Sequence, residues 1–328
     1  MSTTRSWRPI AASLLLALAL PAHAQEAAPP AAAQPAETPV VYDEKADANE
    51  QIAAALAKAK KENRRVLIQW GGNWCGWCIR LHTLFDKEAA VRRKLMYEYD
   101  VVHVDIGQWN KHMDLAEKYG ANLKQHGVPF LTILDADGNV VANQETGSLE
   151  AESNGFHHDP RKVVVFLTKH QAPYPEAQAL LDAAIARAKD EEKMVFLHFG
   201  APWCGWCHRL EDWMAREEVW AILGKEFIDL KIDVDRCTGT TGKSLYAKMR
   251  EGRDEGIPWF AFLDAQGQKL ATSTGPNGNV GFPYEQPEIA HFIAMLEATA
   301  KRLSKDDLEA LRASLAANKA RDQEARSR

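Results

Sequence analysis

The amino-acid sequence repeats itself, and this repeat limits what the chain can fold into. "NWCGWCIRL" at residues 73–81 returns as "PWCGWCHRL" at 202–210, which is 129 positions later. "VLIQW" (66–70) matches "VFLHF" (195–199) at the same offset, and "VPFLTILDADG" (128–138) matches "IPWFAFLDAQG". Such self-similarity indicates a tandem duplication of one unit of about 125 residues, an ordinary domain size.

Each unit shows the same order of expected elements. A helix with an alanine-rich stripe leads to a short apolar strand, and the CGWC tetrapeptide opens a second helix. A β-rich run, an X-Pro apolar strand, an Asp-x-x-Gly hairpin turn and a last helix follow. The expected bounds in the two units are 50–62 and 176–191 for the first helix, 66–70 and 195–199 for the first strand, and 101–106 and 227–234 for the second strand.

The termini differ in composition from the repeats. Arg5 and Arg8 precede an apolar run of 11 residues and the small-residue site Ala22-His23-Ala24, which together are typical of a cleaved secretory signal. Near the other end, Ser304 and Asp307 predict a capping box for a charged helix that packs on the second domain. The expected organisation is a signal peptide (1–24), an Ala/Pro-rich disordered leader (25–44), domain one (45–170), a linker (171–178), domain two (179–302) and a charged C-terminal helix or tail (303–328).

Charge and compartment narrow the function classes. Loss of the signal peptide removes two arginines and takes the net charge from −5 to −7. A mildly acidic chain without a basic cluster is a poor candidate for nucleic acid or for stable membrane insertion. Export to an oxidising compartment, expected to be a bacterial periplasm, would allow the paired cysteines to form disulfides.

The Cys-x-x-Cys pairs carry the chemistry. A sulfur at a helix N-terminus meets free N–H groups and partial positive charge, which stabilise a thiolate. Cys75 or Cys204 would then attack a substrate disulfide, and Cys78 or Cys207 would resolve the mixed disulfide. Trp77 and Trp206 lie inside these loops, where they would contact an apolar substrate segment.

A strand, Trp-Cys-Gly-x-Cys, a helix and a downstream Ile/Val-Pro before a hairpin resemble the thioredoxin superfamily over nearly all of residues 45–300. The resemblance implies an α/β fold of two tandem thioredoxin-like domains, each a central mixed β-sheet flanked by helices. It also implies exposed nucleophiles (Cys75, Cys204) and buried resolving cysteines (Cys78, Cys207). The resemblance implies that Pro129 and Pro258 are cis, and Trp74 and Trp203 match the family pattern just before each motif. Together with the loop residues Trp77 and Trp206 and the adjoining Val128 and Ile257, these are the residues expected to bind substrate.

The sequence departs from thioredoxin at one buried position. Thioredoxin has an aspartate six residues before its first cysteine, which helps to move the resolving proton, whereas this chain has Gln69 and His198. Glutamine cannot transfer a proton at neutral pH but histidine can, so His198 is the candidate for proton transfer. Domain two is therefore expected to react faster than domain one at neutral pH.

The cysteine and histidine motifs also admit metal and haem interpretations, which the sequence does not favour. The two CxxC pairs lie too far apart for a zinc ribbon, and no metal is expected. Cys204–His208 fits the attachment pattern of a c-type haem, but the first copy has Ile79 where the histidine would be. Cys237 is expected to be a passive, partly buried thiol, and Asp159 in "FHHDP" a helix cap rather than a metal ligand.

The function predicted from the sequence is thiol–disulfide exchange in the periplasm, of the reductase or isomerase type, with no cofactor beyond the cysteines. The expected partners are protein thiols and disulfides and a redox protein that recycles the CGWC sites. Two alternatives stay open. One is a chaperone or adaptor whose disulfides only stabilise the fold, and the other is a maturation factor for c-type haem or metalloproteins.

Overall fold

The computed structural model describes residues 39–152, 155, 157–253 and 255–326, the last five without their side chains. The predicted signal peptide and the greater part of the predicted leader lie outside these residues. The leader was predicted to reach residue 44, and this boundary is wrong. Tyr42 is fully buried, because the Asn73 side chain bonds to its backbone and holds it against domain one.

Domain one has a mixed four-stranded sheet in the order β2-β1-β3-β4. β1 pairs in parallel with β2 and antiparallel with β3, and β3 and β4 form a hairpin. Its elements are α1 (Ala48–Glu62), β1 (Arg65–Gly71), α2 (Gly76–Lys87), α3 (Ala89–Glu98), β2 (Tyr99–Asp105), α4 (Met113–Lys118), α5 (Leu123–His126), β3 (Phe130–Leu134), β4 (Val140–Glu145) and α6 (Pro160–Lys169).

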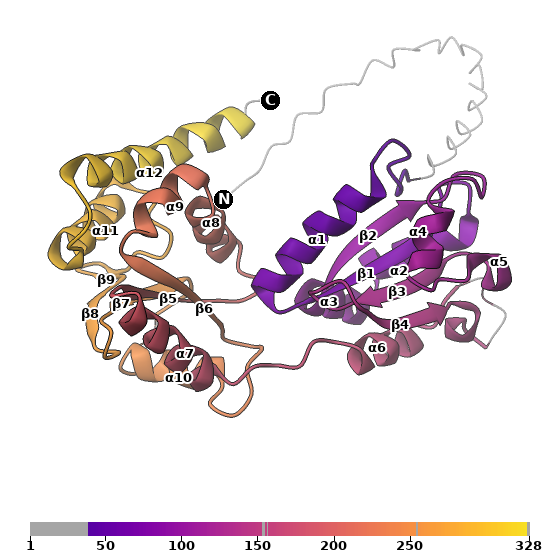
Figure 1. Cartoon of the computed structure of the whole chain (residues 1–328), viewed down its shortest axis with the longest axis horizontal. Coiled ribbons are helices and arrows are strands. Elements are labelled where there is room, and N and C mark those ends of the chain that lie inside the picture. Colours follow the sequence, from indigo (N-terminus) through magenta and orange to yellow (C-terminus); the bar gives the residue numbers. More distant parts are fainter. Residues whose placement is uncertain (1–38, 153–154, 156, 254, 327–328) are drawn as a thin grey trace, which may run out of the picture. The chain divides into compact units, whose positions relative to one another are not determined.

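Domain two repeats this topology with the sheet order β6-β5-β7-β8, as the duplication predicts (Figure 1). It adds a short two-stranded ribbon, β10-β9, that domain one does not share among the described residues. Its elements are α7 (Ala177–Asp190), β5 (Met194–Gly200), α8 (Gly205–Met214), α9 (Glu217–Leu223), β6 (Phe227–Asp233), α10 (Gly242–Met249), β7 (Trp259–Leu263), β8 (Lys269–Thr272), β9 (Thr274–Gly275), β10 (Gly278–Asn279), α11 (Gln286–Thr299) and α12 (Lys305–Arg326).

Helices cover both faces of each sheet, which explains why the central strands are buried along almost their whole length and are mostly apolar. In domain one, α1, α4 and α5 bury side chains against one face, and α2, α3 and α6 against the other. In domain two, α7 and α10 cover one face, while α8, α9, α11 and α12 cover the other. β1 and β5 are buried between these layers. The carboxyl end of each strand leads directly into the CGWC loop.

The C-terminal helix packs on domain two, as the capping box predicted. Asp307 N bonds to Ser304 Oγ at 3.1 Å, and Ser304 N bonds back to the Asp307 carboxylate at 2.9 Å. Leu311 and Leu315 are fully buried in the domain-two core. The helix is therefore an integral part of that domain.

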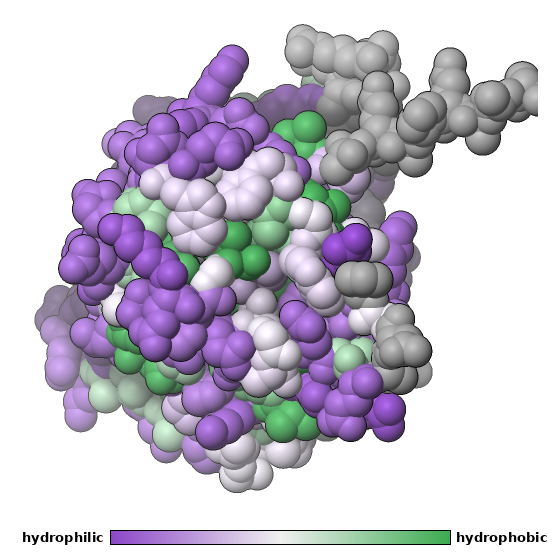
Figure 2. Space-filling view, turned by 90° about the vertical axis from the view of Figure 1, so that its right-hand side faces the viewer, coloured by the Kyte–Doolittle hydropathy of each residue, from purple (hydrophilic) through white to green (hydrophobic). Residues whose placement is uncertain are grey.

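None of the helices described is both long and apolar enough to cross a bilayer. In Figure 2, hydrophilic residues cover most of the visible face, and apolar residues show as small areas between them.

Candidate redox site

The first cysteine of each pair is the N-cap of the helix that follows the central strand. Cys75 has an extended backbone, and its Sγ accepts from Cys78 N at 3.1 Å. Cys204 does the same for α8, with Cys207 N at 3.2 Å. Both sulfurs thus lie at the positive end of a helix, where a thiolate is stabilised.

Both pairs are closed as disulfides, Cys75–Cys78 and Cys204–Cys207, each with 5.2 Å between the two Cα atoms. The expectation of exposed nucleophiles needs correction, because Cys75 and Cys204 are only 6% and 5% exposed. Trp77 and Val128 pack against the first pair, and Val234 and Ile257 pack against the second. The order of accessibility is nevertheless as implied, since Cys78 and Cys207 are 0% and 1% exposed.

The X-Pro segments meet the cysteines, although they lie more than fifty positions away in the sequence. Val128 O is 3.7 Å from Cys75 Sγ, and Ile257 O is 3.6 Å from Cys204 Sγ. The peptide bonds Val128–Pro129 and Ile257–Pro258 are both cis, as the resemblance implied. The carbonyl before each proline therefore faces the sulfur that a substrate would approach.

The four tryptophans have different surroundings. Trp74 and Trp203 are 44% and 55% exposed, and each donates its indole N–H, to Gly107 O at 2.6 Å and to Asp235 Oδ2 at 2.9 Å. Trp77 is half-buried with its ring edge-on to His158. Trp206 is 50% exposed and packs near Phe282, Tyr284 and Arg209.

In domain one, an amide and a phenol lie beside the disulfide, and two imidazole rings pack next to them. Gln69 Nε2 donates to Tyr42 Oη at 2.6 Å and to Cys78 O at 3.0 Å. His82 and His103 pack edge-on, with 5.0 Å between ring centroids. Burial, together with the neighbouring His82, lowers the pKa of His103 to about 4, so this ring stays neutral near pH 7.

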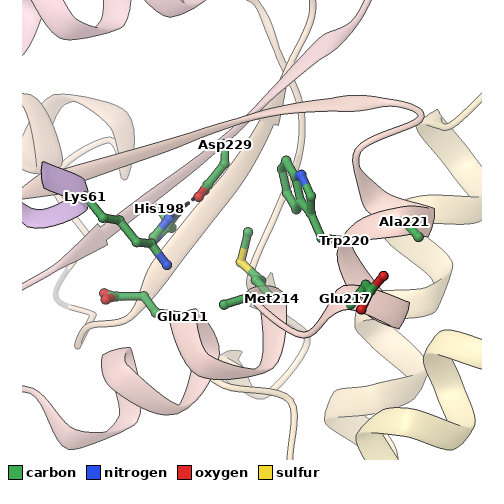
Figure 3. A pocket seen from close by; sticks show the side chains of 9 residues that line it. Lys61, His198, Glu211, Met214, Glu217, Trp220, Ala221 and Asp229 are labelled. Atoms are coloured by element: carbon green, nitrogen blue, oxygen red, sulfur yellow. Dashed lines mark hydrogen bonds and ion pairs between the residues drawn. The ribbon is translucent and has the colours of Figure 1, made fainter. Parts of the chain in front are cut away.

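In domain two, charged groups occupy the matching positions, as Figure 3 shows in part. His198 Nε2 lies 2.9 Å from Asp229 Oδ1, and Lys231 Nζ donates to Glu211 Oε2 at 2.8 Å. Burial opposes ionisation of Asp229, but the charge and hydrogen bond of His198 outweigh it and lower the Asp229 pKa. His198 is 2% exposed and lies on the face of the sheet that α8 covers.

Glu211 is a site residue that the sequence argument missed. Its side chain is buried, and its Oε1 has no hydrogen-bond partner in the described part of the chain. A Cβ placed on Gly200 would lie 3.5 Å from Glu211 Oε1 and 3.5 Å from Cys207 Sγ, so the two atoms flank one point. The signal was its position four residues after Cys207, which puts both side chains on one helix face.

The family model for thioredoxin-like proteins matches this chain twice, at residues 47–136 and 176–265. The two matches include both CGWC motifs and cover more than half of the sequence. The chain belongs to the thioredoxin-like family.

Relatives of this thioredoxin-like chain carry names from disulfide chemistry. It is 24% identical over 243 residues to protein disulfide-isomerase tigA of Aspergillus niger, which covers 67% of this chain and 63% of the relative. It is 26% identical over 98 residues to the disulfide bond reductase DsbH of Chlamydia pneumoniae, covering 28% of this chain and 59% of the relative. A solved disulphide isomerase from Xylella fastidiosa is 27% identical and covers 40% of this chain and 96% of its own, with a TM-score of 0.35. The chain thus spans less than two thirds of the curated relatives named here.

Three motifs outside the cysteine pairs have local structural roles in the thioredoxin-like domains. Asp159 caps α6 by accepting from Arg161 N at 2.8 Å, as predicted. His208 Nε2 lies 2.9 Å from Pro202 O, beside its own motif. Cys237 is a free, buried thiol, and burial raises its pKa to about 11, which disfavours the reactive thiolate.

Proposed function

We propose that this chain is a thiol–disulfide oxidoreductase of the reductase or isomerase type, which acts on protein disulfides through both CGWC pairs. The observation that carries the proposal is the position of Cys75 and Cys204. Each caps a helix, keeps a small exposed edge and faces the carbonyl before a cis-proline. The names of the relatives from Aspergillus niger and Chlamydia pneumoniae support the same chemistry.

The proposed reaction starts from the reduced pair. The thiolate of the first cysteine attacks one sulfur of a substrate disulfide, and the other substrate sulfur leaves as a thiolate and takes up a proton. The second cysteine then loses its proton and attacks the first sulfur, which closes the CGWC disulfide and releases the remaining substrate sulfur. The pair loses two electrons and the substrate disulfide gains them.

Substrate binding is assigned to the surroundings of each pair. The first sulfur of each pair faces a backbone carbonyl, that of Val128 or Ile257, which adjoins Pro129 or Pro258. The tryptophans next to the cysteines in sequence complete the proposed surface: Trp74, Trp203 and Trp206 are exposed, and Trp77 is partly covered. An extended chain segment could bond to the backbone beside each proline and pack its side chains on the indole rings.

A direct test starts with the chain reduced by a dithiol and freed of excess reductant. The reduced chain is then mixed with a substrate protein whose polypeptides are linked by disulfides. One pair of substrate thiols should appear for each CGWC pair that is oxidised. A chaperone or adaptor would instead suppress aggregation of a cysteine-free client and release no thiols. A Soret band in the purified protein would favour the haem-maturation alternative.

The proton of Cys207 needs an acceptor during the second step. Among the titratable groups on that face, the candidates are His198 and Glu211, and the proposal gives the proton to Glu211, whose Oε1 flanks the same point as Cys207 Sγ. Lys231 Nζ donates to the other oxygen of this carboxylate, Oε2, at 2.8 Å. His198, which is tied to Asp229, supports the site as a second proton-transfer group.

Glu211→Gln is therefore expected to slow the second step in domain two by about 100-fold at neutral pH, since an amide cannot accept the proton. The measurement is the decay of the mixed disulfide on Cys204 after rapid mixing, in a chain with Cys75→Ser and Cys78→Ser. Glu217→Gln is the matched control, because Glu217 is an exposed glutamate that borders the same pocket. If the mixed disulfide decayed slowly in His198→Asn but at the parent rate in Glu211→Gln, His198 would be the proton acceptor instead.

Export is part of the proposal. The predicted signal at 1–24 and the disulfide-isomerase relatives support an oxidising compartment, such as a periplasm. The expected mature chain begins at Gln25, and mass spectrometry of the exported protein tests this. The redox partner that recycles the pairs is expected to be a separate protein.

A further inference from the structure

The sulfur of the second cysteine has a different polar neighbour in each domain. The difference lies next to a glycine that occupies the same position in both repeats, Gly71 and Gly200. A Cβ on Gly71 would lie 2.6 Å from Cys78 Sγ and 2.6 Å from Tyr42 Oη. Only glycine leaves room for the phenol and the sulfur to approach one another at this point. At the matching Gly200, the polar neighbour of the sulfur is Glu211 Oε1 instead.

We propose that Tyr42 is part of the redox site of domain one and donates a hydrogen bond from its hydroxyl to the Cys78 sulfur when the pair is reduced. The inference rests on the proposed disulfide exchange. The segment at residues 41–44, which precedes the first repeat, then becomes part of the site. Domain one therefore has a hydrogen-bond donor that does not belong to the repeated unit.

The segment is held in place by Asn73, the residue that differs between "NWCGWC" and "PWCGWC". Asn73 Oδ1 accepts from Val41 N and Tyr42 N, both at 3.0 Å, and its Nδ2 donates to Tyr42 O at 2.9 Å. Lys111 Nζ adds a bond to Glu44 O at 2.9 Å. Domain two has Pro202 at this position, and proline has no side-chain amide with which to hold such a segment.

The orientation of the phenol follows from its hydrogen bonds. Gln69 Nε2 donates to Tyr42 Oη at 2.6 Å, so the oxygen is the acceptor in that bond and its own proton is available to another group. Burial raises the pKa of Tyr42, which keeps the hydroxyl protonated across the physiological range. The same Gly71 point lies 2.6 Å from Cys78 Sγ, and this sulfur is free to accept the phenol proton once the disulfide opens.

A hydrogen bond to a reduced sulfur favours the reduced pair over the disulfide, and a pair whose reduced form is stabilised is the stronger oxidant. An intramolecular hydrogen bond shifts an equilibrium by up to about tenfold. Tyr42→Phe removes the hydroxyl and keeps the ring, so the equilibrium constant for reduction of Cys75–Cys78 should fall by about tenfold. Gln69 retains its bond to Cys78 O in that variant.

The experiment uses the full chain with Cys204→Ser, Cys207→Ser and Cys237→Ser, so that Cys75 and Cys78 are its remaining cysteines. The chain is equilibrated with glutathione buffers, and the reduced fraction of the pair is measured by alkylation and mass spectrometry. Tyr99→Phe is the matched control, because Tyr99 is also buried in domain one but donates to Leu167 O, away from the cysteines. Asn73→Ala, which releases the segment, should reproduce most of the Tyr42→Phe shift.

The inference is overturned if Tyr42→Phe and Tyr99→Phe both keep the equilibrium constant of the parent chain. It is also overturned if Tyr42→Phe shifts the constant in the opposite direction. Failure of the proposed function would look different, because the parent chain would then equilibrate with glutathione yet release no thiols from a protein disulfide.

Discussion

The variant with both Cys75→Ser and Cys204→Ser is expected to reduce protein disulfides no faster than buffer does. Serine keeps the size and the helix cap but cannot form a thiolate, and the thiolate is the nucleophile in exchange. The second cysteines cannot replace them, because Cys78 and Cys207 are 0% and 1% exposed. The measurement is the initial rate of thiol release from a disulfide-containing protein under a recycling reductant.

The single variants separate the two sites. Cys75→Ser should keep more than half of the parent rate, since domain two is expected to be the faster domain, and Cys204→Ser should keep less. Cys237→Ser is the control, because its thiol is buried with a raised pKa and should not contribute. A double variant that still reduced its substrate at the parent rate would remove the cysteine pairs from the mechanism.

Phe292→Ala in α11 is expected to lower the free energy of unfolding of domain two by about 3–5 kcal/mol, because it leaves a cavity in the aromatic core. Phe292 is fully buried. Its ring centroid lies 5.6–6.3 Å from those of four neighbours, Trp213, Phe260, Phe262 and Phe196. Urea unfolding followed by tryptophan fluorescence measures the change.

Glu297→Ala is the control on the same helix, since Glu297 is exposed and should change the free energy of unfolding by less than about 0.5 kcal/mol. If Phe292→Ala and Glu297→Ala unfolded at the same urea concentration, the packing described for α11 would be wrong.

Most of the architecture could be predicted because the sequence repeats. The apolar strands, the Asp-x-x-Gly turns and the helices that begin near Pro160 and Pro287 appear within a few residues of their expected positions. In the turns, Gly138 and Gly267 have positive φ angles of 86° and 77°, a conformation that glycine adopts without strain. Local residue chemistry sets these features, so a single sequence reveals them.

The groups beneath the disulfides were harder to predict, because contacts between distant segments decide them. His198 was singled out by its position six residues before Cys204 in the sequence; it is buried and lines the same pocket as Glu211. Tyr42 lies in a segment that composition assigned to the leader, and only its bonds to Asn73 and Gln69 place it beside Cys78. Exposure of Cys75 was overestimated, since neighbouring loops cover the sulfur.

Trapping the first intermediate tests the central claim most directly. In a chain with Cys78→Ser and Cys207→Ser, the mixed disulfide cannot be resolved, so a disulfide-linked peptide should remain attached to the protein. We predict that peptide mapping by mass spectrometry finds the adduct on Cys75 and Cys204 and leaves Cys237 unmodified. An adduct confined to Cys237, or no adduct in the folded chain, would contradict the assignment of both pairs as redox sites.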